Sequence, residues 1–474
     1  MGQEIASHHF QPQDFQRFQQ ALRQETLDLI AAIPGMSRGG FTAGLELETC
    51  LINAQAGPDA INQAYLQRLN HPQVVPELAQ FNVEMNVTPQ PLTGLGLRQL
   101  HQELQTTWDH CQKVAQELGS RLIMIGILPT LEKQALTLEH ISPLQRYFAL
   151  NEQLLNLRGG IPIQLDICGQ EHFCTTHPDV MLEAATTSFQ IHLQVPPEQM
   201  VPVYNAALMI SGIMVAVTAN SPYFCGYDLW QETRIPVFEQ SIDGVRIPTS
   251  HYQPRVTFGH GYLQESVGEY FLRNQQLYPV ILPVDLSQSR DPYPHVRLHN
   301  GTIWQWNRPL VGVNAAGDPH LRLEHRPLPA GPTVADMMAN AALFYGLVVK
   351  LAEEPERLIG FEQARQNFYR AAQQGIPTRI EWLDNKSLPV DQLLLRELLP
   401  LAEAGLGRLG IDPQDRRTYL GIMAERVASG QTGAVWQRRF VAEHGRDRRR
   451  LTEVYWRWQE TGAPVHTWGM EPPC

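Results

Sequence analysis

The sequence predicts an α+β protein with a mainly antiparallel sheet and a helical C-terminal third. Four separate stretches alternate apolar and polar residues, which is the period-two pattern of strands that bury one face. From Thr333 onward, apolar residues recur instead at helical spacing almost to the end of the chain. No repeat, low-complexity tract or obvious linker divides the 474 residues, so both patterns are expected to belong to one packed unit.

The expected elements of the first half follow one another closely. Apolar residues at helical spacing predict a helix over 13–33, ended by Pro34 and Gly35. Alternation predicts one strand over 44–50 and a second over 76–88, which is closed by Pro89 and Pro91. The other elements expected here are a short helix over 60–69, an amphipathic helix over 97–118, an apolar strand over 121–128, a helix over 142–157 and a strand over 186–195.

The second half begins with an almost uniformly apolar segment. Its core, 206–219, is too short to span a bilayer, so we expect a buried helix over 202–219. Residues 222–310 are rich in Pro, Gly and aromatics and predict loops and short elements, among which 240–262 and 284–300 are candidates for a lid. A strand is expected over 321–327, followed by helices over 334–352, 361–373, 390–404, 413–428 and 434–458.

Composition restricts the class of protein. The chain is 43% apolar and 18% charged, which suits a globular protein with a large core. Its formal net charge is −11 and no predicted face carries a basic stripe, which argues against nucleic acid as the main partner. The six cysteines are scattered, and the N-terminus lacks the basic-then-apolar run of a signal peptide. We therefore expect a cytoplasmic protein without membrane insertion.

The strand over 44–50 places two acids side by side. Leu45 and Leu47 lie on one face, while Glu46 and Glu48 lie on the other, about 6.5–7 Å apart. Two carboxylates at this spacing cannot both be buried as charges without a counter-charge, and they suit a shared pair of divalent cations. Taken alone, the stretch is better explained by a solvated acidic face.

Three further strands repeat the pattern and change this interpretation. Their polar faces carry Asn82, Glu84 and Asn86, then Gln190, His192 and Gln194, then Arg322, Glu324 and Arg326. Carboxylates with one imidazole suit Mg²⁺ or Mn²⁺ better than zinc, and neighbouring arginines suit phosphate. Together the four strands favour a phosphoryl-transfer site over ordinary surface salt bridges. Because the sequence has no P-loop and no dinucleotide fingerprint, ATP would have to be held on the sheet by metal ions and arginines.

Seven short motifs in the region 40–350 are specific in this order and combination. They are Gly44-Leu-Glu-Leu-Glu, Phe81-Asn-Val-Glu-Met-Asn, Thr187-Ser-Phe-Gln-Ile-His-Leu, Ala219-Asn-Ser-Pro-Tyr, Glu232-Thr-Arg-Ile-Pro-Val-Phe-Glu, His299-Asn-Gly-Thr-Ile-Trp-Gln-Trp-Asn and Leu323-Glu-His-Arg-Pro. In these motifs the chain resembles the glutamate–cysteine ligase family 2, carboxylate–amine ligases with a glutamine-synthetase-like catalytic fold. The resemblance implies a curved antiparallel sheet that forms a funnel, with Mg-ATP at one end, an amino-acid carboxylate at the other and helices on the outer face. Residues 1–350 would form the catalytic region, with 1–39 as a helical lead-in and 351–474 as a helical region packed on the same domain.

The resemblance also implies roles for individual residues. By position, the metal ligands of the family match Glu46, Glu48, Glu84, His192 and Glu324. Glu77 is added because the wider superfamily often has a further acid seven residues before the position of Glu84. Arg326 matches the arginine that meets the transferring phosphoryl group, so Arg326 and Glu84 are the expected catalytic residues. Candidates for substrate binding are Arg297, Arg234 and Asn300, although both arginines are equally compatible with structural roles.

These observations predict an ATP-dependent ligase that joins the γ-carboxylate of glutamate to an amine through an acyl phosphate, with cysteine as the default acceptor. Its partners would be small molecules, its metal Mg²⁺ or Mn²⁺, and a homo-oligomer is compatible with the sequence. Three alternatives remain: a ligase for another amine or amino acid, a non-catalytic nucleotide- or amino-acid-binding protein of this fold, and a metal-dependent hydrolase that uses the same acids.

Two further patterns are interpreted as structural. Cys168, His172, Cys174 and His177 lie within ten residues and mimic a zinc cluster, but their spacing lacks a C-x-x-C and the resemblance gives no need for zinc. The arginines in 446–450 occur with acids in a helical pattern, which predicts a solvated face and not a nucleic-acid contact.

Overall fold

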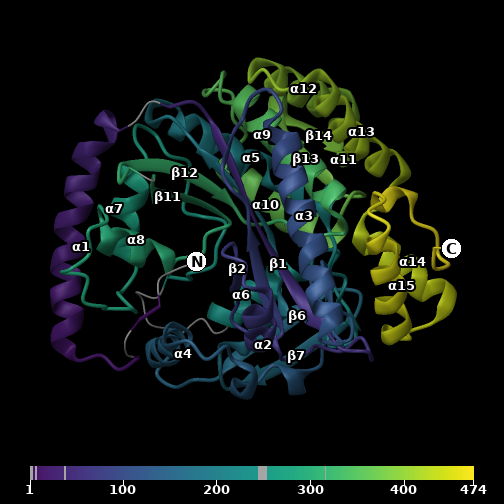
Figure 1. Ribbon diagram of the computed structural model, residues 1–474. Coiled ribbons are helices and arrows are strands. Elements are labelled where there is room, and N and C mark those ends of the chain that lie inside the picture. The colour runs from purple at the N-terminus through teal and green to yellow at the C-terminus, as the bar shows by residue number, and fades with distance from the viewer. Residues whose placement is uncertain (1–3, 6–7, 37–38, 244–252, 315, 474) are drawn as a thin grey trace.

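A computed structural model describes residues 4–5, 8–36, 39–243, 253–314 and 316–473 (Figure 1). Part of the first lid candidate, 244–252, lies outside the described residues. The helices are α1 (Pro12–Ala32), α2 (Asn62–Leu69), α3 (Gly96–Glu117), α4 (Gln145–Leu157), α5 (Met200–Thr218), α6 (Arg234–Asp243), α7 (Gly268–Leu277), α8 (Pro294–Gly301), α9 (Val334–Leu351), α10 (Phe361–Gln374), α11 (Val390–Leu393), α12 (Leu399–Arg408), α13 (Pro413–Ser429), α14 (Gly433–His444) and α15 (Arg448–Glu460).

The main sheet combines strands from the N-terminal two thirds of the chain. Its members are β1 (Thr42–Ile52), β2 (Val74–Pro76), β3 (Asn82–Asn86), β4 (Gln90–Pro91), β5 (Arg121–Ile123), β8 (Phe189–Gln194), β11 (Asn307–Val313) and β12 (Pro319–His325). The strand order is β11-β12-β8-β1-β3-β2, with β4 and β5 also paired to β1, and these pairings are antiparallel. Three two-stranded hairpins lie outside it: β6 (Ile163–Cys168) with β7 (His172–His177), β9 (Tyr223–Phe224) with β10 (Tyr227–Asp228), and β13 (Arg379–Trp382) with β14 (Lys386–Pro389).

Two apolar helices, α5 and α9, lie at the centre of the protein and pack against each other and the sheet. All residues of 203–218 are buried, which confirms the expected buried helix. The hydroxyl of Tyr345 on α9 donates hydrogen bonds to the carbonyl oxygens of Gly44 and His192 at 3.2 and 3.1 Å, so α9 crosses the β1–β8 pair. The segments Pro197–Thr218 and Val334–Leu351 are long and apolar enough to cross a membrane. In the most apolar 18-residue stretch of each, however, 89% and 83% of the residues are buried inside the protein.

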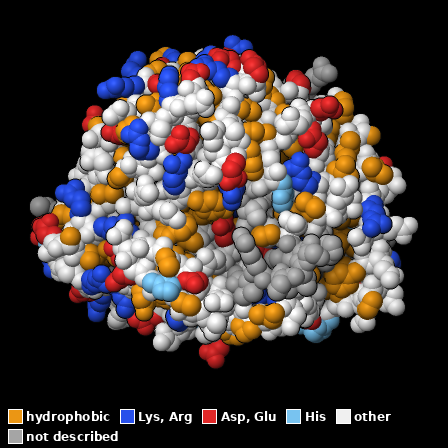
Figure 2. All heavy atoms as spheres, turned by 180° about the vertical axis from the view of Figure 1, so that it is seen from behind, with side chains coloured by type: hydrophobic (Ala, Val, Ile, Leu, Met, Phe, Trp, Pro, Cys, Tyr) orange, Lys and Arg blue, Asp and Glu red, His pale blue; other side chains and the backbone are white. Residues whose placement is uncertain are grey.

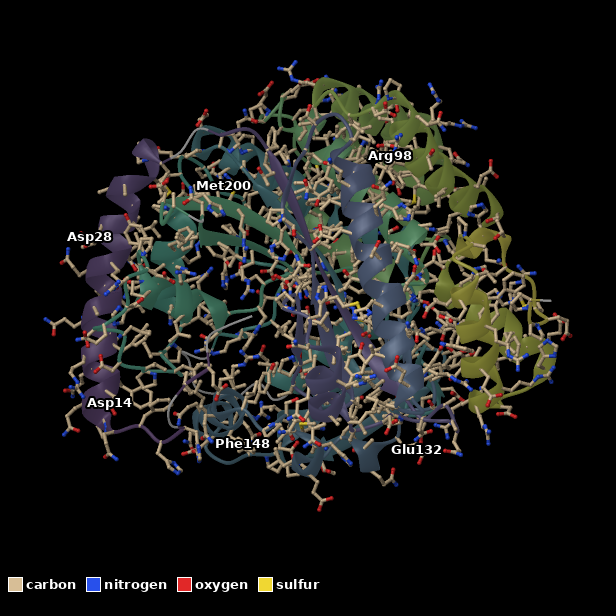
Figure 3. The ribbon with its side chains drawn as sticks, viewed as in Figure 1. Asp14, Asp28, Arg98, Glu132, Phe148 and Met200 are labelled. Atoms are coloured by element: carbon tan, nitrogen blue, oxygen red, sulfur yellow. The ribbon has the colours of Figure 1, made fainter. Side chains whose placement is uncertain are left out.

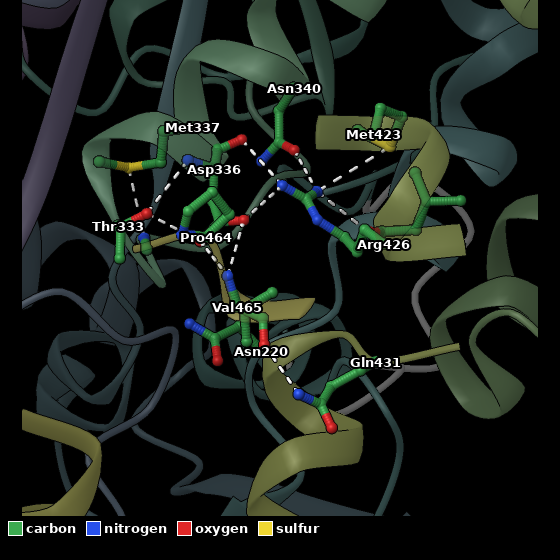
Figure 4. A network of polar contacts seen from close by, with 12 residues as sticks. Asn220, Thr333, Asp336, Met337, Asn340, Met423, Arg426, Gln431, Pro464 and Val465 are labelled. Atoms are coloured by element: carbon green, nitrogen blue, oxygen red, sulfur yellow. Dashed lines mark hydrogen bonds and ion pairs between the residues drawn. The ribbon is translucent and has the colours of Figure 1, made fainter. Parts of the chain in front are cut away.

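The C-terminal helices pack directly on these central helices: α10 contacts α5, while α12 and α13 contact α9. Figure 4 shows a buried connection between them. Arg426 of α13 forms an ion pair with Asp336 of α9 at 2.9 Å and donates a second hydrogen bond to Asn340 at 2.5 Å. The backbone N–H of Val465 donates to Asp336 at 3.0 Å, which ties the C-terminal segment to the same carboxylate. These contacts support our proposal that 351–474 shares one domain with the preceding region.

Polar side chains also join the layers at the surface. Arg98, near the start of α3 (Figure 3), donates to Asp415 at 2.7 Å and to Asp412 at 3.2 Å, linking α3 to α13. On the face shown in Figure 2, basic and acidic side chains are interspersed with apolar ones. Exposed ion pairs such as Arg365–Glu362, at 2.6 Å, contribute little to stability because water screens them.

The structure corrects several predicted boundaries. The strand expected over 76–88 is confined to β3, because β2 ends at Pro76 and the backbone then turns before β3 begins at Asn82. The strand expected over 121–128 ends at Ile123, where the side chain of Gln459 takes over the backbone hydrogen bonds of Met124. The helix expected over 434–458 is two helices, because Gly445 has a φ of 83° and Asp447 caps α15. The hairpins β6–β7 and β13–β14 were not predicted.

Candidate active site

The predicted polar faces meet on one side of the main sheet because of the strand register. Glu48 lies opposite Glu84 on the β1–β3 pair, and His192 lies opposite Glu324 on the β8–β12 pair. Arg326 follows β12 directly, and its backbone N–H donates to the carbonyl of Trp306 at 2.9 Å. The structure thus brings together residues that are almost 280 positions apart in the sequence.

Three carboxylates form what we call the acid cluster: Glu48, Glu77 and Glu84. One carboxylate oxygen from each lies within 4.8 Å of the others. Glu77 occupies the turn between β2 and β3, where its Oε2 accepts a hydrogen bond from the backbone of Leu78 at 2.9 Å. Its Oε1 is buried and has no hydrogen-bond partner among the described residues. A buried carboxylate oxygen of this kind is suited to a cation.

The protonation of the acid cluster reflects a local shortage of positive charge. Burial, and then Glu48, Glu84 and Glu183, raises the pKa of Glu77 well above its ordinary value. Burial and the neighbouring Glu46 raise the pKa of Glu84 to about 7. Burial and Glu48 likewise raise the pKa of Glu183, in the short 3₁₀ segment Val180–Ala185, to about 8. The donor set is oxygen-rich, and the nearby Arg326 and Arg234 offset its charge only in part, so it fits Mg²⁺ or Mn²⁺.

Glu46 has the opposite electrostatic environment. Its Oε1 lies 3.0 Å from Nε2 of His192, and both side chains are largely buried. Burial opposes ionisation of Glu46, but the charge and hydrogen bond of His192 hold its pKa well below the ordinary value. Glu46 is two residues before Glu48 on β1, so this ionised carboxylate and its imidazole partner lie on the same face as the acid cluster.

Glu324 is held between two guanidinium groups, and we call Arg308, Glu324 and Arg326 the Glu324 triad. Nη2 of Arg308 donates to both carboxylate oxygens, at 2.8 and 3.1 Å, and its Nε adds a third bond at 3.2 Å. Nη1 of Arg326 donates to Glu324 from the other side. Burial opposes ionisation, but Arg308 and Arg326 lower the pKa of Glu324 to about 2. Glu324 in turn raises the pKa of Arg326, against the effect of burial.

Gln190 connects the two halves of the site. Its Oε1 accepts from Nη1 of Arg326 at 2.7 Å, and its Nε2 donates to Glu48 at 3.0 Å. Arg234, the first residue of α6, is 2% exposed. It pairs with Glu232 at 3.3 Å and donates to the carbonyl oxygen of Arg326 at 3.2 Å. Carboxylates suited to cations thus lie next to guanidinium groups suited to phosphate, which is the chemistry of phosphoryl transfer.

The other two candidate substrate residues lie on α8. Arg297 is partly exposed and pairs with Asp291 at 2.7 Å. The side chain of Asn300 is buried: its amide nitrogen donates to the carbonyl of Pro309 at 2.9 Å, and its oxygen accepts from Asn274 at 2.8 Å. The structure therefore engages both side chains away from the acid cluster, and their substrate roles stay predictions.

Sequence reasoning missed two charged residues of this site. Arg308 lies opposite Glu324 in the β11–β12 hairpin, and the turn 314–318 between two apolar runs was the available signal for that hairpin. Glu183 follows a helix cap at Asp179 and lies on no strand, so no alternating pattern could have identified it.

Comparisons with known proteins agree with this architecture. The sequence profile of glutamate-cysteine ligase family 2 matches residues 42–454, whereas no curated protein matches the chain. A crystal structure of glutamate–cysteine ligase from Francisella tularensis in complex with AMP is similar at a TM-score of 0.53 and 11% identity, covering 92% of this chain and 91% of that one. A bifunctional glutathione synthetase from Pasteurella multocida is similar at a TM-score of 0.50 and 12% identity, covering 94% of this chain but 55% of that one. These likenesses confirm the predicted α+β, glutamine-synthetase-like fold.

Proposed function

Because the chain belongs to glutamate-cysteine ligase family 2, it is an ATP-dependent carboxylate–amine ligase, and we propose that it joins glutamate to cysteine. The observation that best supports this reaction is the hydrogen-bonded connection from Arg326 through Gln190 to Glu48. It places a fixed positive charge beside buried acids, as transfer of the γ-phosphoryl group of ATP requires. A cytoplasmic location and a role in glutathione supply are part of this proposal.

The proposed metal ligands are the acid cluster together with Glu46, His192 and Glu324. The unpartnered Oε1 of Glu77 and the raised pKa values of Glu77 and Glu84 support this assignment. Bound Mg²⁺ or Mn²⁺ would neutralise charge on the phosphates of ATP. Glu84, opposite Glu48 in the register, is proposed to be essential for turnover because it belongs to the buried core of this cluster.

The proposed reaction has two steps. An oxygen of the glutamate γ-carboxylate attacks the γ-phosphorus of ATP, giving an acyl phosphate and ADP. The amino group of cysteine then attacks the acyl carbon, phosphate leaves, and the nitrogen loses a proton to give the amide. Arg326 would stabilise charge on the phosphoryl oxygens, while Arg308 keeps Glu324 ionised and so holds Arg326 in place. Arg234, Arg297 and Asn300 stay our candidates for binding the amino-acid substrates.

The acceptor amine is the least constrained part of the proposal. A purified-enzyme assay would measure ADP release with Mg²⁺, ATP and glutamate, and would compare cysteine with 2-aminobutyrate, which lacks only the thiol, and with a panel of other amines. Mass spectrometry would identify the product. We expect cysteine-dependent ADP release and γ-glutamylcysteine.

Three results would change this conclusion. Release of ADP with another amine but not with cysteine would reassign the acceptor while leaving the ligase mechanism intact. ATP binding without ADP release for any amine would indicate a binding protein, and ATP-independent hydrolysis would favour the hydrolase alternative. Aspartate in place of glutamate is the matched control for the carboxylate substrate, and we expect it to support little turnover.

A further inference from the structure

The β6–β7 hairpin, at the lower edge of the view in Figure 1, has a polar outer face that the ligase reaction does not use. Inner-facing Leu165, Ile167 and Phe173 are buried. The residues that alternate with them are exposed, and they include Asp166, Cys168, His172 and Cys174. In the register, Asp166 lies opposite Cys174, and Cys168 lies opposite His172. A thiol, an imidazole and a carboxylate therefore share one side of a two-stranded ribbon.

Three of these groups approach one another closely. Ligand atoms of Asp166, Cys168 and His172 all lie within 4.8 Å of one another. Nε2 of His172 is 2.7 Å from Oδ1 of Asp166, so the carboxylate already orients the imidazole. His177, which the sequence pattern grouped with these residues, is buried on the inner face and makes hydrogen bonds to the carbonyl oxygens of Leu136 and Asp179 at 2.7 and 3.0 Å. Asp166 therefore takes the place that the spacing alone suggested for His177.

The backbone that carries these groups is fixed on its outer edge. The side chain of Gln240 accepts from the N–H of Asp166 at 2.7 Å and donates to its carbonyl at 3.2 Å. The indole N–H of Trp230 donates to the carbonyl of Cys168 at 2.8 Å. Hence neighbouring elements set the positions of the Cα atoms of Asp166 and Cys168, and only their side-chain rotations remain to be ordered when a ligand binds.

We propose that Asp166, Cys168 and His172 form a surface Zn²⁺ site, with water in the remaining coordination position. Thiolate and imidazole ligands suit Zn²⁺ and disfavour Mg²⁺, which prefers oxygen ligands only. With Zn–ligand bonds of about 2.0–2.3 Å, two ligands of one ion lie about 3.3–3.8 Å apart, which modest rotations of exposed side chains can achieve from the observed spacing. Binding would release the thiol proton of Cys168, and His172 would bind in its neutral form through the ring nitrogen that carries no proton.

Co²⁺ titration of the reduced, metal-free full-length protein tests this site directly. A Co²⁺–thiolate bond gives a charge-transfer absorption that carboxylate ligands cannot give. Co²⁺ bound by the acid cluster would therefore contribute nothing to this band. Excess Mg²⁺ would keep that cluster occupied. We expect a thiolate band that saturates at one Co²⁺ per chain and disappears when Zn²⁺ is added.

Variants on the same hairpin provide the controls. Cys168→Ser should abolish the band, and His172→Ala should weaken Co²⁺ binding at least tenfold, with unchanged thermal midpoints of the metal-free proteins because both side chains are exposed. Cys174→Ser, equally exposed on the same face, is the matched control and should keep the band. No thiolate band in the wild-type protein would overturn the proposal. So would a band that persists in Cys168→Ser, or unaltered Co²⁺ affinity in His172→Ala.

Discussion

Replacement of Arg326 by methionine removes the guanidinium group and keeps much of the side-chain volume. In the structure this group is 12% exposed and donates hydrogen bonds to Glu324 and to Gln190. Glu324 would still receive three hydrogen bonds from Arg308, so no carboxylate is left unpaired. We therefore expect the substitution to lower the free energy of unfolding by about 1–3 kcal/mol, the usual range for losing buried hydrogen bonds to a charged group.

The catalytic effect should be much larger. An arginine that stabilises a transferring phosphoryl group contributes about 10³–10⁵-fold to kcat, which corresponds to about 4–7 kcal/mol of barrier. ADP release by Arg326→Met should therefore fall at least 10³-fold at saturating substrates, while its circular dichroism spectrum stays that of the wild type. Arg326→Lys, which keeps the charge but loses the planar fork, should retain intermediate activity.

Arg98→Met is the matched control, because it removes a guanidinium that pairs with two carboxylates between α3 and α13. It should reduce stability slightly and leave kcat unchanged. A folded Arg326→Met enzyme with kcat within tenfold of the wild type would refute the role assigned to Arg326.

Three further predictions concern stability. Adding Mg²⁺ to the metal-free protein at pH 8 should raise its thermal midpoint, because the cation relieves repulsion among buried carboxylates. The increase should be smaller in Glu77→Gln, and an equal increase in both proteins would exclude Glu77 as a ligand. Burial raises the pKa of Glu239 to about 7, so the thermal midpoint of the wild type should fall as pH rises from 5 to 8. Glu239→Gln keeps an acceptor for Trp306 and Tyr369, and its midpoint should fall less over the same range. Arg426→Met should lower the free energy of unfolding by about 3–5 kcal/mol, measured by urea denaturation, because it leaves the carboxylate of Asp336 buried without its cation; a loss below 1 kcal/mol would contradict this account.

The sequence carries most of the fold because burial follows a local period. In β1, the alternation of apolar and polar residues that predicted a strand corresponds to an alternation of buried and half-buried side chains. The apolar helices α5 and α9 were predicted within two residues of their observed ends. One boundary that was wrong depends on a distant partner: Met124 leaves the sheet because Gln459, more than 330 residues later, takes its backbone hydrogen bonds. No local pattern encodes such a contact.

The same distinction holds for the candidate site. Residues on alternating strands, such as Glu48 and Glu84, could be assigned to one face from the sequence, and the register places them opposite each other. Glu183 could not, because it enters from a 3₁₀ segment, and Arg308 could not be paired with Glu324 until the hairpin register was known. The hydrogen-bonded role of Gln190 likewise appears only in three dimensions, since the sequence placed it on a polar strand face without indicating its partners.

The two halves of the site differ in a way that bears on how it works. The Glu324 triad is electrostatically satisfied: its carboxylate is ionised, with a pKa of about 2, and both guanidinium groups are paired. The acid cluster is not, because burial and mutual repulsion raise the pKa of Glu77 and Glu84. Since raised carboxyl pKa values weaken the folded state as pH rises, the acid cluster opposes folding at neutral pH until a cation binds. The arginine half is therefore in place before substrates arrive, whereas the acid half is completed by the metal. The free energy of metal binding thus acts mainly at the acid cluster, where positive charge is missing.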